Sequence, residues 1–127
     1  MAASTVGPMS GIEPVHVFGI PNCDTVRKAR AAIVQLGVDA EFHDFKKEGI
    51  SPDHARRWID AAGWQRVINR AGTTWRSLPD AVKAGVVDDA SAAAVIVASP
   101  SIVKRPVVEW SDGSLTIGFR GGEFLAV

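Results

Sequence analysis

The chain has 127 residues, of which 46% are hydrophobic and 22% are charged, enough for one domain with a buried core. Its 14 basic and 14 acidic side chains give a formal net charge of zero, which argues against nucleic acid or an anionic membrane as a partner. The single cysteine excludes a disulfide within the chain, and the three histidines are too scattered for a metal-ligand motif. We therefore expect a cytoplasmic protein that binds no metal.

The first 14 residues are small and rich in Gly and Pro, without the basic start and apolar core of a signal peptide. We interpret them as a disordered extension and place a single domain at residues 15–127. The longest apolar runs, such as residues 92–98, are far shorter than a membrane span. The sequence therefore predicts no membrane association.

The first part of the domain has the pattern of a β-α-β unit. Residues 15–18 are predicted to form one strand and residues 40–45 another. Between them, residues 24–36 have helical periodicity and are followed by Gly37, a common helix stop. The apolar face of this helix comprises Val26, Ala29, Ile33 and Leu36. A crossover of this kind joins parallel strands.

The middle of the chain is predicted to be a helical insertion at about residues 51–99. Ser51 is a suitable N-cap and Pro52 a suitable first residue for a helix that ends near residue 62. Further short helices are expected at residues 64–69, 78–84 and 90–98, with a loop at residues 70–76. The last of these helices is almost wholly apolar and is therefore predicted to be buried.

The end of the chain returns to a β pattern. Residues 107–110 and 114–119 flank an Asp-Gly pair at residues 112–113, which predicts a β-hairpin. Two glycines at residues 121–122 then interrupt the pattern, and five residues remain. The order of a β-α-β unit, a helical block and a hairpin predicts an α/β, thioredoxin-like fold with a helical insertion and a short or missing C-terminal helix.

Cys23 is the most informative residue of the chain. It lies between a predicted strand and a predicted helix, so its thiol is expected at or beside the helix N-terminus. Free backbone N–H groups and the positive end of the helix dipole stabilise a thiolate there. The alternative is a buried cysteine that acts as a small hydrophobic group. The position favours a one-thiol redox or transfer site.

Three separated segments agree in order and spacing with a known family. They are GIPNCDTVRKAR at residues 19–30, NRAGTTWR at residues 69–76 and IVKRPVV at residues 102–108. With these segments the chain resembles the arsenate reductase ArsC/Spx family, most closely its YffB-like branch, over roughly residues 15–119. The resemblance implies a thioredoxin-like domain with an all-helical insertion, and a C-terminal helix that is nearly absent here.

The resemblance also implies a chemistry. It makes Cys23 a nucleophile toward an oxidised thiol or a small oxyanion, and Arg105 a residue that binds the anion and supports the thiolate. It implies that Pro106 is a cis-proline. Because the chain has no second cysteine, an external thiol must complete the reaction. Glutathione is the expected co-substrate, with glutaredoxin as a further partner, and no tightly bound cofactor is expected.

The chain differs from true arsenate reductases at two of three anion-binding arginines. The first position corresponds to Asn69, beside Arg70, and the third to Phe119, beside Arg120. Arg70 and Arg120 are therefore candidate replacements. Further candidates for binding the anion or glutathione are Asn22, Arg27, Arg76, Pro106 and Asn69 itself. A solvated helix face, with Lys28 paired to Asp24, explains the basic residues of the first helix equally well.

Three functions follow from this pattern. We expect a glutathione-coupled thiol oxidoreductase, and the alternatives are a genuine arsenate reductase and a non-enzymatic, Spx-like regulator that binds RNA polymerase. Val26 takes the place of the second cysteine of an Spx-type Cys-x-x-Cys switch, which argues against the switch but not against binding. Neither His16, His43 nor His54 is spaced from Cys23 like a catalytic base.

Overall fold

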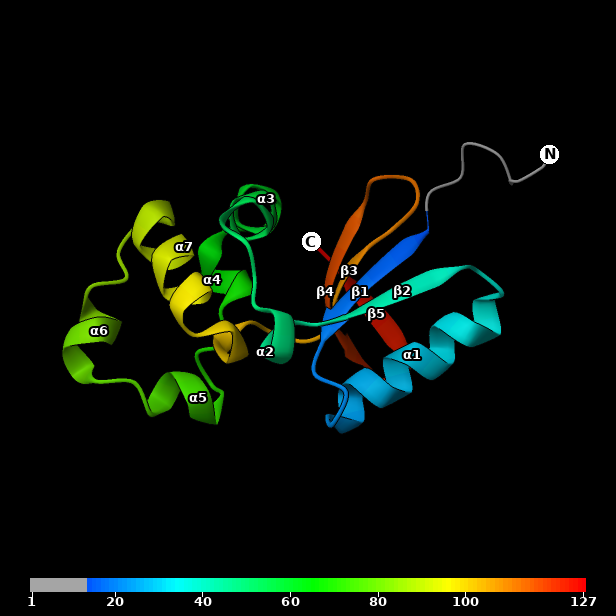
Figure 1. Ribbon diagram of the computed structural model, residues 1–127, viewed down its shortest axis with the longest axis horizontal. Coiled ribbons are helices and arrows are strands. Elements are labelled where there is room, and N and C mark those ends of the chain that lie inside the picture. The colour runs from blue at the N-terminus through cyan, green and yellow to red at the C-terminus, as the bar shows by residue number, and fades with distance from the viewer. Residues whose placement is uncertain (1–13) are drawn as a thin grey trace.

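The centre of the molecule is a five-stranded sheet with the strand order β2-β1-β3-β4-β5 (Figure 1). The computed structural model describes residues 14–127, so the predicted N-terminal extension lies almost wholly outside the described residues. The strands are β1 (Val15–Gly19), β2 (Ala40–Asp44), β3 (Val107–Glu109), β4 (Leu115–Arg120) and β5 (Glu123–Ala126). β1 and β2 are parallel and the other neighbours are antiparallel, which confirms the predicted β-α-β unit and the hairpin.

Helix α1 (Asp24–Leu36) covers one face of the sheet. Cys23 is its N-cap, and Gly37, with a φ of 72°, ends it by donating its N–H to the Val34 carbonyl. Val26, Ala29 and Ile33 are buried as predicted. Leu36 was expected on the same face but is 59% exposed.

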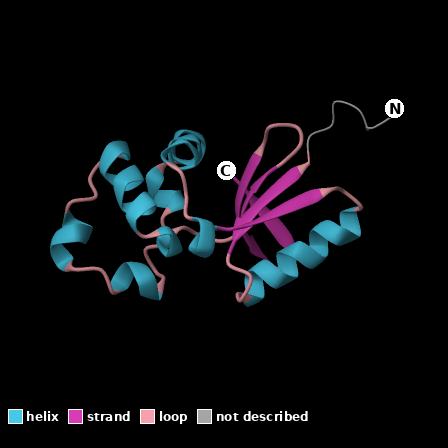
Figure 2. Ribbon diagram, in the orientation of Figure 1, coloured by secondary structure: helices cyan, strands magenta, loops and turns pink. Residues whose placement is uncertain are grey.

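The helices between β2 and β3 form a block at one end of the sheet (Figure 2). They are α2 (Phe45–Glu48), α3 (Pro52–Ala62), α4 (Trp64–Val67), α5 (Thr73–Arg76), α6 (Asp80–Ala84) and α7 (Asp89–Ala98), followed by a 3-10 turn at Pro100–Ile102. The Ser51 hydroxyl accepts the His54 N–H, which confirms the predicted cap of α3. α3 and α7 pack on each other around the fully buried Trp58.

The structure differs from three sequence predictions in this block. Phe45 starts α2 instead of ending β2, because the Asp44 carboxylate accepts the N–H groups of Lys46 and Lys47. Residues 73–76, expected in a loop, form the short helix α5. The apolar helix α7, expected to be buried, is buried only at Ala92, Ala93, Val95 and Ile96, and its exposed residues are Asp89, Ala90, Ala94, Val97 and Ala98.

The C-terminus is a strand and not a shortened helix. Gly121 and Gly122 have φ values of 63° and 81°, so they form a tight turn that reverses the chain after β4. β5 then pairs antiparallel with β4. The two glycines, expected to interrupt regular structure, instead build the last hairpin.

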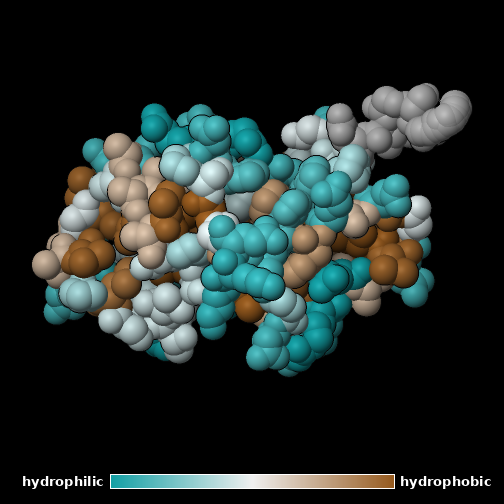
Figure 3. All heavy atoms as spheres, viewed as in Figure 1, coloured by the Kyte–Doolittle hydropathy of each residue, from teal (hydrophilic) through white to brown (hydrophobic). Residues whose placement is uncertain are grey.

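The surface carries apolar side chains at both ends of the molecule (Figure 3). Large exposed apolar residues lie on or beside the helical block and at the end of α1: Val82, Val87, Val97, Val34, Leu36 and Val38. Among the described residues, no helix is long and apolar enough to cross a membrane.

Candidate active site

Cys23 lies where β1 turns into α1. Its backbone is extended, with φ −126° and ψ 126°, and its carbonyl accepts the Arg27 N–H at 2.9 Å. The residue is partly buried, and its thiol makes no capping hydrogen bond to the helix. A Cβ on Gly19 would lie 2.9 Å from Val26 Cγ2, so this glycine allows the end of β1 to approach α1 closely. The predicted location of the thiol at a helix N-terminus is confirmed.

A cavity of about 340 Å³ opens beside Cys23. Three separate parts of the chain line it together with the start of α1, and the lining residues are Cys23, Thr25, Asn69, Lys104, Arg105, Gly118, Phe119, Arg120 and Leu125. Three of these side chains are cationic, and none is acidic. The cavity therefore offers charge-assisted hydrogen bonds to an anion next to the thiol.

Two of the lining segments are held together by backbone pairing. Ile68 and Val103 form an antiparallel bridge. Beside it, the Asn69 N–H donates to the Ile102 carbonyl at 2.8 Å, and the Lys104 N–H donates to the Val67 carbonyl at 2.8 Å. This pairing places Asn69 next to the segment that carries Lys104 and Arg105, two of the three cationic side chains.

The next segment of the site follows a cis peptide bond. The bond between Arg105 and Pro106 is cis, as the family resemblance implies. The Pro106 carbonyl accepts the Gly118 N–H at 2.9 Å, which fixes β4 to this segment. Gly118 has a φ of 98°, and a Cβ there would lie 3.1 Å from both Lys104 Cε and Leu125 Cδ1. The glycine thus keeps this wall of the cavity open.

The structure brings together four of the nine residues proposed from sequence. Cys23, Asn69, Arg105 and Arg120 all line the cavity, whereas the other five do not: Asn22, Arg27, Arg70, Arg76 and Pro106. Pro106 is buried, and Asn22 is exposed.

The arginines outside the cavity make other contacts. Arg27 pairs with Asp24, so the local ion pair of α1 involves this residue and not Lys28. The Arg70 guanidinium lies 5.8 Å from the centre of the Trp64 ring. The backbone carbonyl of Arg76 accepts the Lys83 ammonium at 3.2 Å. Of the two replacement arginines, only Arg120 reaches the cavity.

Sequence reasoning missed Thr25, Lys104, Gly118, Phe119 and Leu125 as lining residues. The sequence could have indicated Lys104, because it directly precedes Arg105 inside the IVKRPVV motif. Phe119 entered the sequence analysis only as the position of a missing arginine. No sequence feature points to Leu125, since it belongs to the strand β5, which the sequence did not predict.

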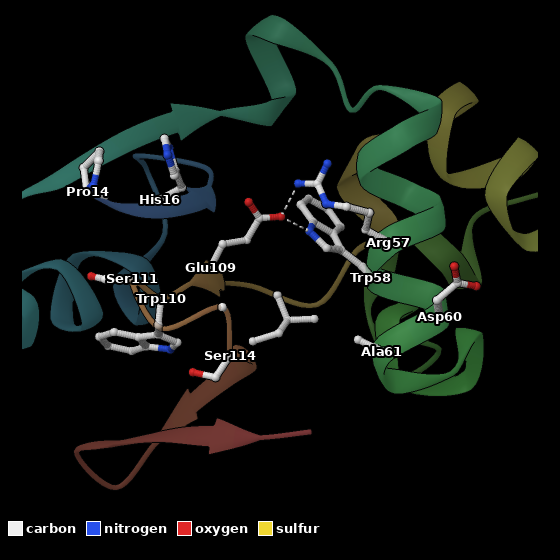
Figure 4. A pocket seen from close by; sticks show the side chains of 12 residues that line it. Pro14, His16, Arg57, Trp58, Asp60, Ala61, Glu109, Trp110, Ser111 and Ser114 are labelled. Atoms are coloured by element: carbon white, nitrogen blue, oxygen red, sulfur yellow. Dashed lines mark hydrogen bonds and ion pairs between the residues drawn. The ribbon is translucent and has the colours of Figure 1, made fainter. Parts of the chain in front are cut away.

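A second cavity, of about 670 Å³, lies between α3, β1 and the β3–β4 hairpin (Figure 4). Glu109 is at its centre and accepts hydrogen bonds from Trp58 Nε1 at 2.9 Å and Arg57 Nη2 at 2.6 Å. Burial raises the pKa of the Glu109 carboxyl, but these two hydrogen bonds, together with the charges of Arg57 and His54, outweigh it and leave the pKa below its ordinary value. The cavity is larger than the first but contains no thiol, so the thiol chemistry belongs to the Cys23 cavity.

The histidines lie apart from Cys23, and none lines its cavity. His16 and His43, 27 positions apart in sequence, are joined by a hydrogen bond between their rings. Burial, and secondarily the charge of Arg57, lowers the pKa of His54 below its ordinary value. Sequence spacing suggested no metal-ligand group, yet His16, His43 and Glu41 meet on neighbouring strands.

The comparison with known families gives the relationship directly. The family model described as ArsC family matches residues 18–127. The chain belongs to the ArsC family. Its five-stranded mixed sheet with helices matches the thioredoxin-like fold of ArsC-related structures, which confirms the predicted α/β class.

Individual proteins resemble this chain over most of their own length. An uncharacterized protein of Haemophilus influenzae is 33% identical over 112 residues, which are 88% of this chain and 96% of that protein. The solved structure of the YFFB (PA3664) protein is 45% identical, with a TM-score of 0.78 over 84% of this chain and 91% of that one. An arsenate reductase (ArsC) related protein from Brucella melitensis is 46% identical, with a TM-score of 0.68 over 91% and 92%.

Proposed function

We propose that this ArsC-family protein is a glutathione-coupled thiol oxidoreductase that uses Cys23 as its nucleophile. One observation carries the proposal: the single thiol of the chain is at a helix N-terminus and lines a cavity with three cationic side chains. Both features favour a thiolate, which is the reactive form of cysteine. Membership of the ArsC family supports the same chemistry.

The reaction proceeds by thiol–disulfide exchange. The Cys23 thiolate attacks one sulfur of an oxidised substrate disulfide, a mixed disulfide forms, and the other sulfur leaves as a thiolate. A glutathione thiolate then attacks the mixed disulfide and releases the first substrate sulfur, which leaves Cys23 bonded to glutathione. A second glutathione restores the Cys23 thiolate and leaves as oxidised glutathione. The two electrons therefore come from two glutathione molecules.

The cationic side chains recognise the co-substrate in this proposal. Glutathione carries two carboxylates, and Lys104, Arg105 and Arg120 offer complementary charge beside the thiol. The Asn69 side chain contributes a neutral donor and acceptor to the same cavity. Glutaredoxin is a second candidate reductant of the Cys23–glutathione disulfide.

The test is turnover of a glutathionylated peptide with glutathione, glutathione reductase and NADPH. We expect NADPH consumption with the native protein and none above background with Cys23→Ser. Intact-mass analysis should show one glutathione bound per chain in the native protein under oxidising conditions. The Cys23→Ser variant should have the same midpoint of thermal unfolding as the native protein, because serine preserves the shape of the N-cap residue. Turnover above background in this variant would contradict the proposed mechanism.

Arsenate reduction is the second candidate, and the position of Arg120 favours it. Arg120 and Lys104 join Arg105 in the cavity, so three cations surround the thiol although two family arginines are absent in register. The same coupled assay with arsenate in place of the peptide separates the two functions. Arsenate-dependent NADPH consumption that requires both Cys23 and Arg120 supports arsenate as the substrate; turnover of the peptide alone supports the thiol oxidoreductase.

A further inference from the structure

Three potential metal ligands meet on the face of the sheet opposite α1. The parallel register pairs His16 of β1 with Glu41 of β2. Alternate residues of a strand share a face, so His43 lies on the same face as Glu41. One donor atom from each of the three residues lies within 4.8 Å of the others. The other face of β1 packs against α1 through Val17 and Ile33.

The two imidazole rings already present nitrogens to each other. His16 Nδ1 lies 2.9 Å from His43 Nε2. Two nitrogens bound to one tetrahedral Zn²⁺ at about 2.0–2.1 Å lie roughly 3.3 Å apart. A slight opening of the pair therefore admits an ion in place of the proton that the two rings share.

His43 has the surroundings of a ligating histidine. Its ring stacks on Phe18, with centroids 4.6 Å apart and planes 17° apart. Its second nitrogen, Nδ1, faces the Glu48 carboxylate at 3.9 Å. A carboxylate behind a ligating imidazole fixes the ring orientation and raises the basicity of the ligand. In the structure, Nε2 is directed toward His16, and a small movement of the Glu48 side chain from 3.9 Å would give Nδ1 a hydrogen-bond acceptor.

We propose that His16, Glu41 and His43 bind one Zn²⁺ ion. Two imidazoles and one carboxylate suit Zn²⁺, whereas Mg²⁺ and Ca²⁺ prefer oxygen ligands alone. Glu41 is exposed on β2, an edge strand of the sheet, so the fourth coordination position faces solvent. The ion joins β1 to β2 and stabilises the folded chain by binding.

Calorimetric titration of untagged Cys23→Ser protein with Zn²⁺ tests the site, because this background has no competing thiol. We expect saturable binding of one ion per chain and a higher midpoint of thermal unfolding. Co²⁺ should give the visible absorption of a tetrahedral site. His43→Phe keeps an aromatic ring against Phe18, and Glu41→Gln alters an exposed side chain. Each should weaken Zn²⁺ binding by more than the roughly 10- to 100-fold typical of outer-shell changes.

His54→Ala is the matched control. His54 belongs to the same aromatic cluster, with its ring centroid 4.9 Å from that of Phe18. It contacts Ser51 Oγ through Nδ1 at 2.9 Å and is not one of the three donors. We expect unchanged Zn²⁺ affinity in this variant. No saturable binding in the Cys23→Ser parent, or equal weakening by His54→Ala and Glu41→Gln, overturns the proposal.

Discussion

Three cationic side chains from distant parts of the chain line the cavity that contains the Cys23 thiol. Lys104 and Arg105 come from the segment before β3, and Arg120 comes from the end of β4. A thiolate in this cavity is attracted by all three, and the interactions are moderate because the site is open to water. Single substitutions should therefore tune the nucleophile without abolishing it.

Arg105→Ala should slow the alkylation of Cys23 by iodoacetamide at neutral pH. Removal of one cation weakens the electrostatic attraction between the cavity and the anionic sulfur that attacks iodoacetamide. A part-exposed charge pair contributes roughly 0.2–1 kcal/mol, so we expect a decrease of up to about fivefold. The rate is measured by mass spectrometry at low salt, where screening is weakest.

Arg70→Ala is the control for this effect. The Arg70 guanidinium lies over Trp64, and Arg70 does not line the cavity. The substitution nevertheless removes the same charge from the protein as Arg105→Ala does. Its alkylation rate should match that of the native protein. An equal decrease in both variants would show that net charge, and not position in the cavity, sets the rate.

Sequence reasoning found the residues that lie in contiguous motifs and misjudged those placed by tertiary structure. Cys23 and Arg105 were recognisable because their neighbours define a helix start and a proline segment. Choosing between Arg70 and Arg120 required knowing which of them reaches the cavity. The contact of His16 with His43 depends on the register of two parallel strands, which no spacing along the chain encodes.

Among the elements, the β4–β5 hairpin contributes most to the site for its length. It supplies four lining residues, and it is joined to the Arg105–Pro106 segment through the Gly118 N–H. The sequence predicted α1 at its observed bounds because the apolar periodicity of residues 24–36 is helical and Gly37 marks its end. It missed β5 because the turn glycines look like a break when the strand after them is four residues long.

Gly118→Ala should both destabilise the protein and alter the site. The positive φ costs roughly 1–3 kcal/mol with a side chain, and the new Cβ would press on Lys104 and Leu125. We expect a lower midpoint of urea unfolding and a changed alkylation rate of Cys23 in the folded protein.

Gly113→Ala separates the two effects. Gly113 also has a positive φ, 88°, but a Cβ there meets nothing within 4 Å. This variant should lose a comparable amount of stability and keep the native alkylation rate. A native rate in Gly118→Ala as well would show that the cavity tolerates the added methyl group.

At the scale of the whole molecule, Glu109 joins the helical block to the sheet. It lies on β3 and accepts hydrogen bonds from Trp58 and Arg57 of α3 (Figure 4). Trp58 is fully buried, so its indole N–H depends on this acceptor. The carboxylate therefore fixes the orientation of α3, and with it the helical block, relative to β3.

Glu109→Gln should lower the free energy of unfolding at neutral pH, because it weakens the hydrogen bonds to Trp58 and Arg57. The expected loss is only about 1 kcal/mol, because Arg57 is largely exposed and its ion pair is screened by solvent. The pKa of Glu109 is lowered on folding, so its charged form stabilises the native state above the ordinary value of 4.5. That contribution is lost as the pH falls through the lowered pKa of the folded protein. Urea unfolding of both proteins should therefore give a stability difference that is constant near neutrality and shrinks below about pH 4.5.

Glu123→Gln, at an exposed carboxylate of β5, should show neither the loss nor the pH dependence. A Glu109→Gln difference that persists unchanged in acid would mean that side-chain packing, and not the charged hydrogen bonds, holds the helical block to the sheet.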